Sequence, residues 1–132
     1  RVLTCAAGAE ARLFSGAHGD GLRGPQHHFA WCDELAKWRQ AGKAWDNLML
    51  GLRLGDNPRA LVTTTPRPIP ALKAIIADSE TACTGGGTAA NPHVSARFVA
   101  SMERQHRGTR LGRQELDGEW IGEIEGALWR GR

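Results

Sequence analysis

The sequence alternates between short apolar or β-branched runs and longer segments in which apolar residues recur with a helical period. The runs at 29–32 (FAWC) and 60–65 (ALVTTT) are typical of buried strands. The helical stripes consist of Trp45, Leu48, Met49 and Leu52 after the first run, and of Ile69, Leu72, Ile75 and Ile76 after the second. Strands that alternate with helices predict an α/β fold built on a parallel sheet.

Weaker signals extend this pattern. Ala9–Ser15 alternates loosely and is a candidate strand, and Thr81–Thr84 is a candidate third strand before a glycine-rich turn at 85–87. Gly55 is expected to stop the first helix, and Ser95 is expected to cap a later one. The chain therefore predicts a sheet of at least three strands.

Composition limits the class of protein. The chain has 132 residues, 41% of them hydrophobic and 23% charged, which suits one globular domain at most. No apolar run approaches the roughly 18 residues that a membrane helix needs, and no signal peptide is recognisable, so we expect a cytoplasmic protein. The first residue is Arg1, and we expect the chain to be part of a longer protein.

Charge and cysteine content are less specific. The net charge of +3 and the pI of about 9.1 permit contact with nucleic acid, although a surplus of this size also occurs without it. Three well-separated cysteines without a CxxC motif are typical of reduced thiols. A zinc site from His27, His28 and Cys32 matches no common ligand spacing.

Asp33 and Glu34 end the first apolar run, where a ligand site is expected in a parallel sheet. In nucleotide hydrolysis the first carboxylate can help to hold Mg²⁺, usually through water, and the second can activate the attacking water. The alternative is that both acids only cap the next helix, whose first turn favours negative charge.

Thr63, Thr64 and Thr65 end the second run, and their hydroxyls are candidates for contact with the attacking water or the γ-phosphate. The alternative is β-propensity combined with turn chemistry before Pro66. Arg23 lies in a glycine-rich loop before the first run and is a candidate phosphate ligand, in its own subunit or a neighbour's. The alternative is a solvated surface arginine.

Two glycine patterns do not carry a nucleotide site. The G-x-G-x-x-G text at 19–24 is followed by Pro25 and a strand, whereas the dinucleotide motif needs a helix there. Gly42-Lys43 lacks both the upstream glycine and the Ser or Thr of a P-loop.

Taken together, the order of these pieces resembles the large terminase subunit of tailed bacteriophages and phage-like gene transfer agents. The resemblance covers nearly the whole chain and is carried by LRGPQHHFAWCDELAKW (22–38), AWDNLMLGLRLGDNPRALVTTTPRP (44–68), GTRLGRQELDGEW (108–120) and EGALW (125–129).

The resemblance implies a role for each candidate residue. Asp33 and Glu34 would end a Walker B segment, with Asp33 serving Mg²⁺ and Glu34 as the catalytic carboxylate. Thr63–Thr65 would be the coupling motif that links ATP hydrolysis to movement. Arg23 would act across a subunit interface as an arginine finger.

The resemblance also implies a P-loop NTPase fold of the ASCE type that carries the Walker B and coupling strands. The sequence contains no Walker A strand-loop-helix, and the family's nuclease residues would lie beyond position 132. Residues 1–107 would be the C-terminal part of the ATPase domain, and 108–132 would lead towards the nuclease domain. The segment Gly85–Pro92 looks shorter and more glycine-rich than is usual in the family.

The expected function is that of a DNA-packaging motor, which couples ATP hydrolysis to translocation of double-stranded DNA. The cofactors would be ATP and Mg²⁺, and the partners would be DNA, the portal protein, the small terminase subunit and further copies in a ring. Without a Walker A loop, the 132-residue chain alone is expected to hydrolyse ATP poorly. The alternatives are a non-enzymatic DNA-binding module and an inactive prophage remnant.

Overall fold

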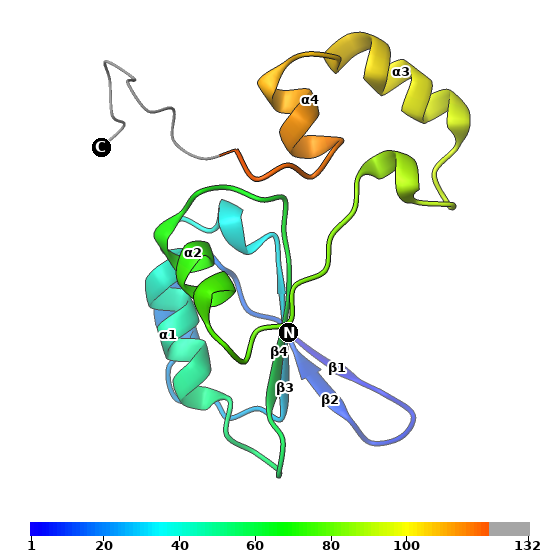
Figure 1. Ribbon diagram of the computed structural model, residues 1–132. Coiled ribbons are helices and arrows are strands. Elements are labelled where there is room, and N and C mark those ends of the chain that lie inside the picture. The colour runs from blue at the N-terminus through cyan, green and yellow to red at the C-terminus, as the bar shows by residue number, and fades with distance from the viewer. Residues whose placement is uncertain (122–132) are drawn as a thin grey trace. The chain divides into compact units, whose positions relative to one another are not determined.

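The computed structural model describes residues 1–121, which form helices and short strands as an α/β fold requires (Figure 1). The chain divides into two compact units, residues 1–64 and the part from Thr65 onward. The EGALW segment at 125–129 lies outside the described residues.

The first unit contains the predicted parallel pair of strands, which lie side by side in Figure 1. Strand β3 (Phe29–Asp33) pairs in parallel with β4 (Arg59–Thr63), and the register places Trp31 opposite Leu61 and Asp33 opposite Thr63. The prediction of parallel pairing is confirmed. Both carboxyl ends therefore meet at one edge of the sheet.

The prediction that both strands are buried is wrong. Phe29, Trp31 and Leu61 on one face of the sheet are 58%, 65% and 48% exposed, whereas Cys32 on the other face is 1% exposed. Successive side chains of a strand point to opposite faces, and within the described residues this sheet has two strands, one face of which is covered. An apolar run was therefore insufficient evidence for burial on both faces.

The core of the first unit is formed by buried side chains of α1 and of the short helical turns before and after β3, together with Cys32 of β3. Helix α1 (Ala41–Gly51) buries Ala41, Ala44 and Leu48, while Met49 from the predicted stripe is 43% exposed. The helix ends at Gly51, four residues before the predicted stop. A Cβ at Gly51 would collide with the carbonyl oxygen of Pro25, so this close approach needs glycine.

Two smaller features complete the first unit. Strands β1 (Val2–Thr4) and β2 (Glu10–Arg12) form an antiparallel hairpin, which confirms the central part of the strand predicted at 9–15. The 3₁₀ helix η1 (Gly19–Leu22) packs on α1, and η2 (Leu35–Lys37) follows β3 directly.

The regular secondary structure of the second unit, within its described residues, consists of helices. Helix α2 (Pro70–Ala77) confirms the second predicted helix; Leu72 and Ile75 of its stripe are buried, whereas Ile76 is 45% exposed. Helix α3 (Ala96–His106) begins where predicted, because the Ser95 hydroxyl accepts a hydrogen bond from the amide of Phe98 (3.2 Å). The short helices η3 (Thr88–Ala90) and α4 (Arg110–Glu115) complete it.

The third strand predicted at 81–84 is wrong. The segment has no strand structure, and both two-stranded sheets formed by the described residues belong to the first unit. It begins in a turn in which the amide of Thr81 donates to the carbonyl of Asp78 (3.1 Å), and within the described residues it pairs with no strand. Four β-prone residues do not form a strand without such a partner.

The glycine-rich segment has a packing role. The amide of Thr88 donates to the carbonyl of Leu116 (2.6 Å), and a Cβ on Gly87 would lie 2.9 Å from the same carbonyl oxygen. The segment thus packs on the end of α4. The boundary predicted at residue 108 stays a prediction; Gly108 itself forms the turn between α3 and α4 with a φ of +75°.

None of the helices within residues 1–121 has the length and the apolar character that a membrane span requires.

Candidate functional site

Asp33 and Thr63 meet at the carboxyl ends of the two parallel strands. The register places them opposite each other, and the Thr63 hydroxyl donates a hydrogen bond to Asp33 Oδ1 over 2.8 Å. The amide of Glu34 donates to the Thr63 carbonyl (2.7 Å), which continues the ladder one residue beyond β3. The structure therefore brings Asp33, Glu34 and Thr63 together, as the sequence predicts.

Glu34 has an unusual backbone for its residue type. Its φ of 52° and ψ of 43° lie in the left-handed region, which costs a non-glycine residue about 1–2 kcal/mol. This turn carries the Glu34 side chain away from the strand direction. Carboxylate oxygen Oε1 lies 3.2 Å from Lys37 Nζ, whereas Oε2 is buried without a hydrogen-bond partner in the structure. An unsatisfied carboxylate oxygen can accept a proton or orient a water molecule.

Thr64 has a different partner. Its hydroxyl accepts a hydrogen bond from the amide of Ala36 (3.1 Å), one of the amides in the first turn of η2. The Glu34 side chain occupies the N-cap position of η2 but makes no capping hydrogen bond. The observed cap thus comes from the neighbouring strand, and the alternative in which Glu34 serves only as a cap loses its support.

Two tryptophans that the sequence reasoning missed contact the same cluster. The indole Nε1 of Trp31 donates to the Thr63 hydroxyl (2.9 Å), and that of Trp38 donates to the carbonyl of Asp33 (3.0 Å). Trp31 lies two residues before Asp33, on the same face of the strand, diagonally across from Thr63. The strand period of two residues was the signal that could have identified it.

Thr65 belongs to the second unit. Its hydroxyl donates to Glu115 Oε2 (3.1 Å), while Glu115 Oε1 lies 3.6 Å from the Arg67 guanidinium. The amide of the Gln114 side chain donates to the carbonyl of Pro66 (2.6 Å). The segment after β4 is therefore held by α4, within the GRQEL text of the resemblance.

Arg23 is not brought to the cluster. It is exposed at the end of η1, and the hydrogen bonds and ion pairs of Asp33 and Glu34 within residues 1–121 do not involve it. Two residues later the chain packs on Gly51 at the end of α1, beside the amino end of β3. Arg23 itself follows η1, whose Gly19 packs against Ala44 in the first half of α1.

A charge pair fixes the surroundings of Arg23. Lys43 on α1 lies 2.8 Å from Asp20 Oδ1 and 2.9 Å from Oδ2. The hydrogen bond from Lys43 and its positive charge lower the pKa of Asp20, with a smaller contribution from the charge of Arg23. Asp20 therefore pairs with Lys43, and the Arg23 guanidinium remains outside this ion pair.

The cluster offers oxygen ligands, which are the kind that Mg²⁺ prefers. It does not form a cage: within the described part of the chain, no group of three His, Cys, Asp or Glu side chains is placed to hold a metal ion. Mg²⁺ usually keeps several waters and binds one or two carboxylates together with substrate phosphates. The Asp33 carboxylate and the Thr63 hydroxyl fit a Mg²⁺ of that kind, bound with a nucleotide.

The zinc alternative receives no support. Cys32 is buried, and burial raises the pKa of its thiol to about 11, which opposes the thiolate that zinc needs. Burial, and secondarily the charge of Arg12, lower the pKa of His27. Its ring meets Phe14 edge to face, with the centroids 5.6 Å apart.

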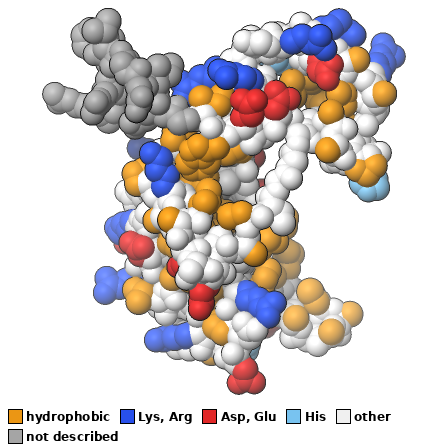
Figure 2. Space-filling view, in the orientation of Figure 1, with side chains coloured by type: hydrophobic (Ala, Val, Ile, Leu, Met, Phe, Trp, Pro, Cys, Tyr) orange, Lys and Arg blue, Asp and Glu red, His pale blue; other side chains and the backbone are white. Residues whose placement is uncertain are grey.

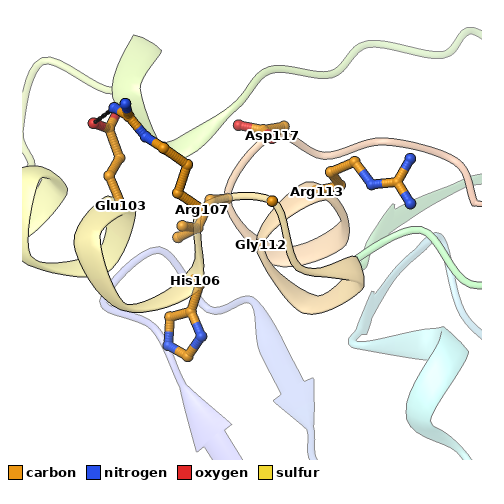
Figure 3. A pocket seen from close by; sticks show the side chains of 8 residues that line it. Glu103, His106, Arg107, Gly112, Arg113 and Asp117 are labelled. Carbon is orange, nitrogen blue, oxygen red and sulfur yellow. Dashed lines mark hydrogen bonds and ion pairs between the residues drawn. The ribbon is translucent and has the colours of Figure 1, made fainter.

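The second unit contains a cavity of about 170 Å³ between α3 and α4. Figure 3 shows the Arg107 guanidinium turned towards Glu103, with which it pairs over 3.2 Å, while Arg113 points away from both. None of the candidate catalytic residues lines this cavity. We therefore assign it no role in nucleotide chemistry.

Helix α3 also contributes positive charge to the surface, and Figure 2 shows Lys and Arg side chains over α3 and α4. Arg97, Arg104 and Arg110 are exposed and form no salt bridge with any described residue. Arg107 and Arg113 pair with Glu103 and Glu119. Unpaired arginines on one helix pair are typical of a surface that contacts phosphates.

Comparison with protein families gives one result for the whole chain. The model described as terminase large subunit, T4-like-virus type, N-terminal, matches residues 1–132. A search of curated proteins and a search of solved structures each found no match. The family match agrees with the resemblance seen in the Asp-Glu and threonine segments.

Proposed function

Because the chain belongs to the family of terminase large subunits, whose role is in phage DNA packaging, we propose that it carries the ATP-hydrolysing site of the packaging motor. The proposed fold is the ASCE type of P-loop NTPase, in which β3 is the Walker B strand and β4 the coupling strand. The proposed cofactors are ATP and Mg²⁺. The proposed partners are double-stranded DNA, the portal protein, the small terminase subunit and further copies in a ring.

The observation that supports this proposal best is the arrangement at the strand ends. The Thr63 hydroxyl donates to Asp33, which is proposed to bind Mg²⁺, and the left-handed backbone of Glu34 turns the second carboxylate away from the strand. Mg²⁺ would neutralise charge that develops on the phosphates during transfer. The unpartnered Oε2 of Glu34 is free to orient the attacking water and accept its proton.

Arg23 is proposed to act on a neighbouring subunit. Among the hydrogen bonds and ion pairs of Asp33 and Glu34 within residues 1–121, none involves Arg23, which favours action on a neighbour's phosphate. An arginine that reaches a neighbour's γ-phosphate stabilises the charge of the transition state. This role requires the ring that the family resemblance implies.

Glu34→Gln in the full-length large subunit tests the catalytic assignment. The amide keeps the size of the side chain but is not a base, so we expect ATP turnover to fall by about 10²–10⁴-fold with nearly unchanged ATP binding. Glu103→Gln is the matched control, since Glu103 also pairs with a cation one helical turn away, in the second unit. If Glu34→Gln abolishes ATP binding, or leaves turnover intact, Glu34 is structural and the proposal fails.

A second candidate function, DNA binding without catalysis, is favoured by the unpaired arginines of α3 and α4. Each phosphate contact contributes about −0.9 to the slope of log affinity against log salt concentration. Changing both Arg97 and Arg104 to Gln should therefore reduce this slope by about 2 if both contact phosphates. Arg39→Gln with Arg53→Gln in the first unit is the control. DNA affinity that responds to α3 and never to nucleotide would favour this second function.

A further inference from the structure

Trp31, Thr63 and Asp33 form a chain of two hydrogen bonds. The indole N–H of Trp31 donates to the Thr63 hydroxyl over 2.9 Å, and that hydroxyl donates to Asp33 Oδ1 over 2.8 Å. We propose that Trp31 is a positioning residue, which orients the Asp33 carboxylate through Thr63. The consequence for Mg²⁺ rests on the function proposed above for Asp33.

The donors and acceptors in these two hydrogen bonds follow from the chemistry of the three side chains. An indole nitrogen only donates, an ionised carboxylate only accepts, and a hydroxyl has one proton and two acceptor lone pairs. Trp31 therefore occupies a lone pair of Thr63 and leaves the single hydroxyl proton for Asp33. Without the indole N–H, the hydroxyl could turn its proton to water, and one oxygen of Asp33 would lose its fixed partner.

Other contacts hold the backbone of this cluster independently of Trp31. Trp38 donates to the Asp33 carbonyl over 3.0 Å, and the Glu34 amide donates to the Thr63 carbonyl over 2.7 Å. Trp31 itself is 65% exposed, so its ring contributes little packing within the first unit. Loss of the Trp31 N–H should thus change the orientation of the Asp33 carboxylate and leave the pairing of β3 with β4 intact.

Indole N–H resonances in the ¹⁵N-labelled full-length protein test the Trp31–Thr63 hydrogen bond, and the measurement does not depend on ATP turnover. Trp31→Phe, which keeps an aromatic ring, identifies the Trp31 signal by its disappearance. We expect Thr63→Val to shift this signal and to speed its exchange with solvent, and Thr63→Ser to restore both. The Trp38 signal is the internal control, since its acceptor is a backbone carbonyl. A Trp31 signal unaffected by Thr63→Val would overturn the proposal.

The affinity for a divalent cation then tests whether the Trp31–Thr63–Asp33 hydrogen bonds contribute to metal binding. Mn²⁺ binding is titrated in the presence of a non-hydrolysable ATP analogue. Trp31→Phe should weaken Mn²⁺ binding about threefold to tenfold, the effect of one neutral hydrogen bond. In the Thr63→Val background, Trp31→Phe should not weaken Mn²⁺ binding further, because the hydrogen bonds that connect Trp31 to Asp33 through Thr63 are already lost. An equal loss in both backgrounds would mean that Trp31 acts by packing, and the proposal would fail.

The two proposals can fail separately. If Asp33→Asn leaves Mn²⁺ affinity unchanged, the metal role of Asp33 fails, while the indole spectra still decide whether Trp31 is hydrogen-bonded to Thr63. If Asp33→Asn weakens Mn²⁺ binding and Trp31→Phe does not, the metal role stands and the positioning role is overturned.

Discussion

The hydroxyl of Thr64 accepts a hydrogen bond from the amide of Ala36, so that the residue after β4 caps the turn that follows β3. Capping groups usually come from the residue that precedes a helix. Here Glu34 occupies that place without capping, and the hydroxyl arrives from 28 residues along the chain. This arrangement leaves the Glu34 carboxylate available for other chemistry.

Thr64→Val should destabilise the first unit. Valine keeps the β-branched shape and removes the acceptor, which leaves the amide of the buried Ala36 without its partner. The expected loss is about 1–2 kcal/mol in the free energy of unfolding, measured by urea denaturation. Thr64→Ser keeps the hydroxyl and should retain most of the stability. Equal stability of the valine variant and the native protein would show that the cap is dispensable.

Glu34→Gly should separate stability from catalysis. Glycine adopts the left-handed conformation without strain, whereas alanine keeps the strain. The free energy of unfolding should therefore be about 1 kcal/mol higher for Glu34→Gly than for Glu34→Ala. Both variants lose the carboxylate and should lose ATP turnover equally. Urea midpoints and hydrolysis rates of the two variants check this. A glycine variant that is no more stable than the alanine variant would argue against strain at Glu34.

Arg23→Ala should lower ATP hydrolysis by about 10³-fold or more in the assembled ring if Arg23 acts as an arginine finger. A role across the interface has a specific signature in mixed rings. Subunits with Glu34→Gln still supply Arg23, so mixing them with Arg23→Ala subunits should restore part of the activity. Mixed rings as inactive as either parent would exclude this role for Arg23.

Cys32 should make the first unit less stable at alkaline pH. Its folded pKa, raised to about 11, lies above the ordinary value of 9.0, so the folded state holds the proton more tightly than the unfolded state does. The resulting stability is present below pH 9 and is lost as the pH rises towards 11. Urea midpoints measured at about pH 8 and pH 10.5 should differ more in the native protein than in Cys32→Ala. An equal difference in both proteins would contradict the assignment.

Local signals predicted the parts of the fold that depend on neighbouring residues. The apolar runs, the stripe of α2 and the hydroxyl of Ser95 act within a few residues, and each is found in its element. The strand expected at 81–84 failed because a strand depends on a partner elsewhere in the chain. Burial of β3 failed for a similar reason, since the number of covered faces is a property of the whole sheet.

The positions of Asp33, Glu34 and Thr63 were predictable from the sequence, whereas the place of Arg23, the partner of Thr65 and the hydrogen bonds of the two tryptophans were not. Asp33, Glu34 and Thr63 were identified from their places at strand ends, and the parallel register brings them together. Their hydrogen-bond partners depend on which residues face each other across β3 and β4. The contribution of Trp31 was missed because an apolar run was read only as core.

Three adjacent threonines bind three different partners: Thr63 binds Asp33, Thr64 binds Ala36 and Thr65 binds Glu115. The run is therefore not a repetitive stretch in which one hydroxyl can substitute for the next. A shift of one residue along this run would change the contact with Asp33, the contact with Ala36 and the contact with Glu115 all at once. Natural variation at these positions should consequently be judged residue by residue, even though the side chains are identical.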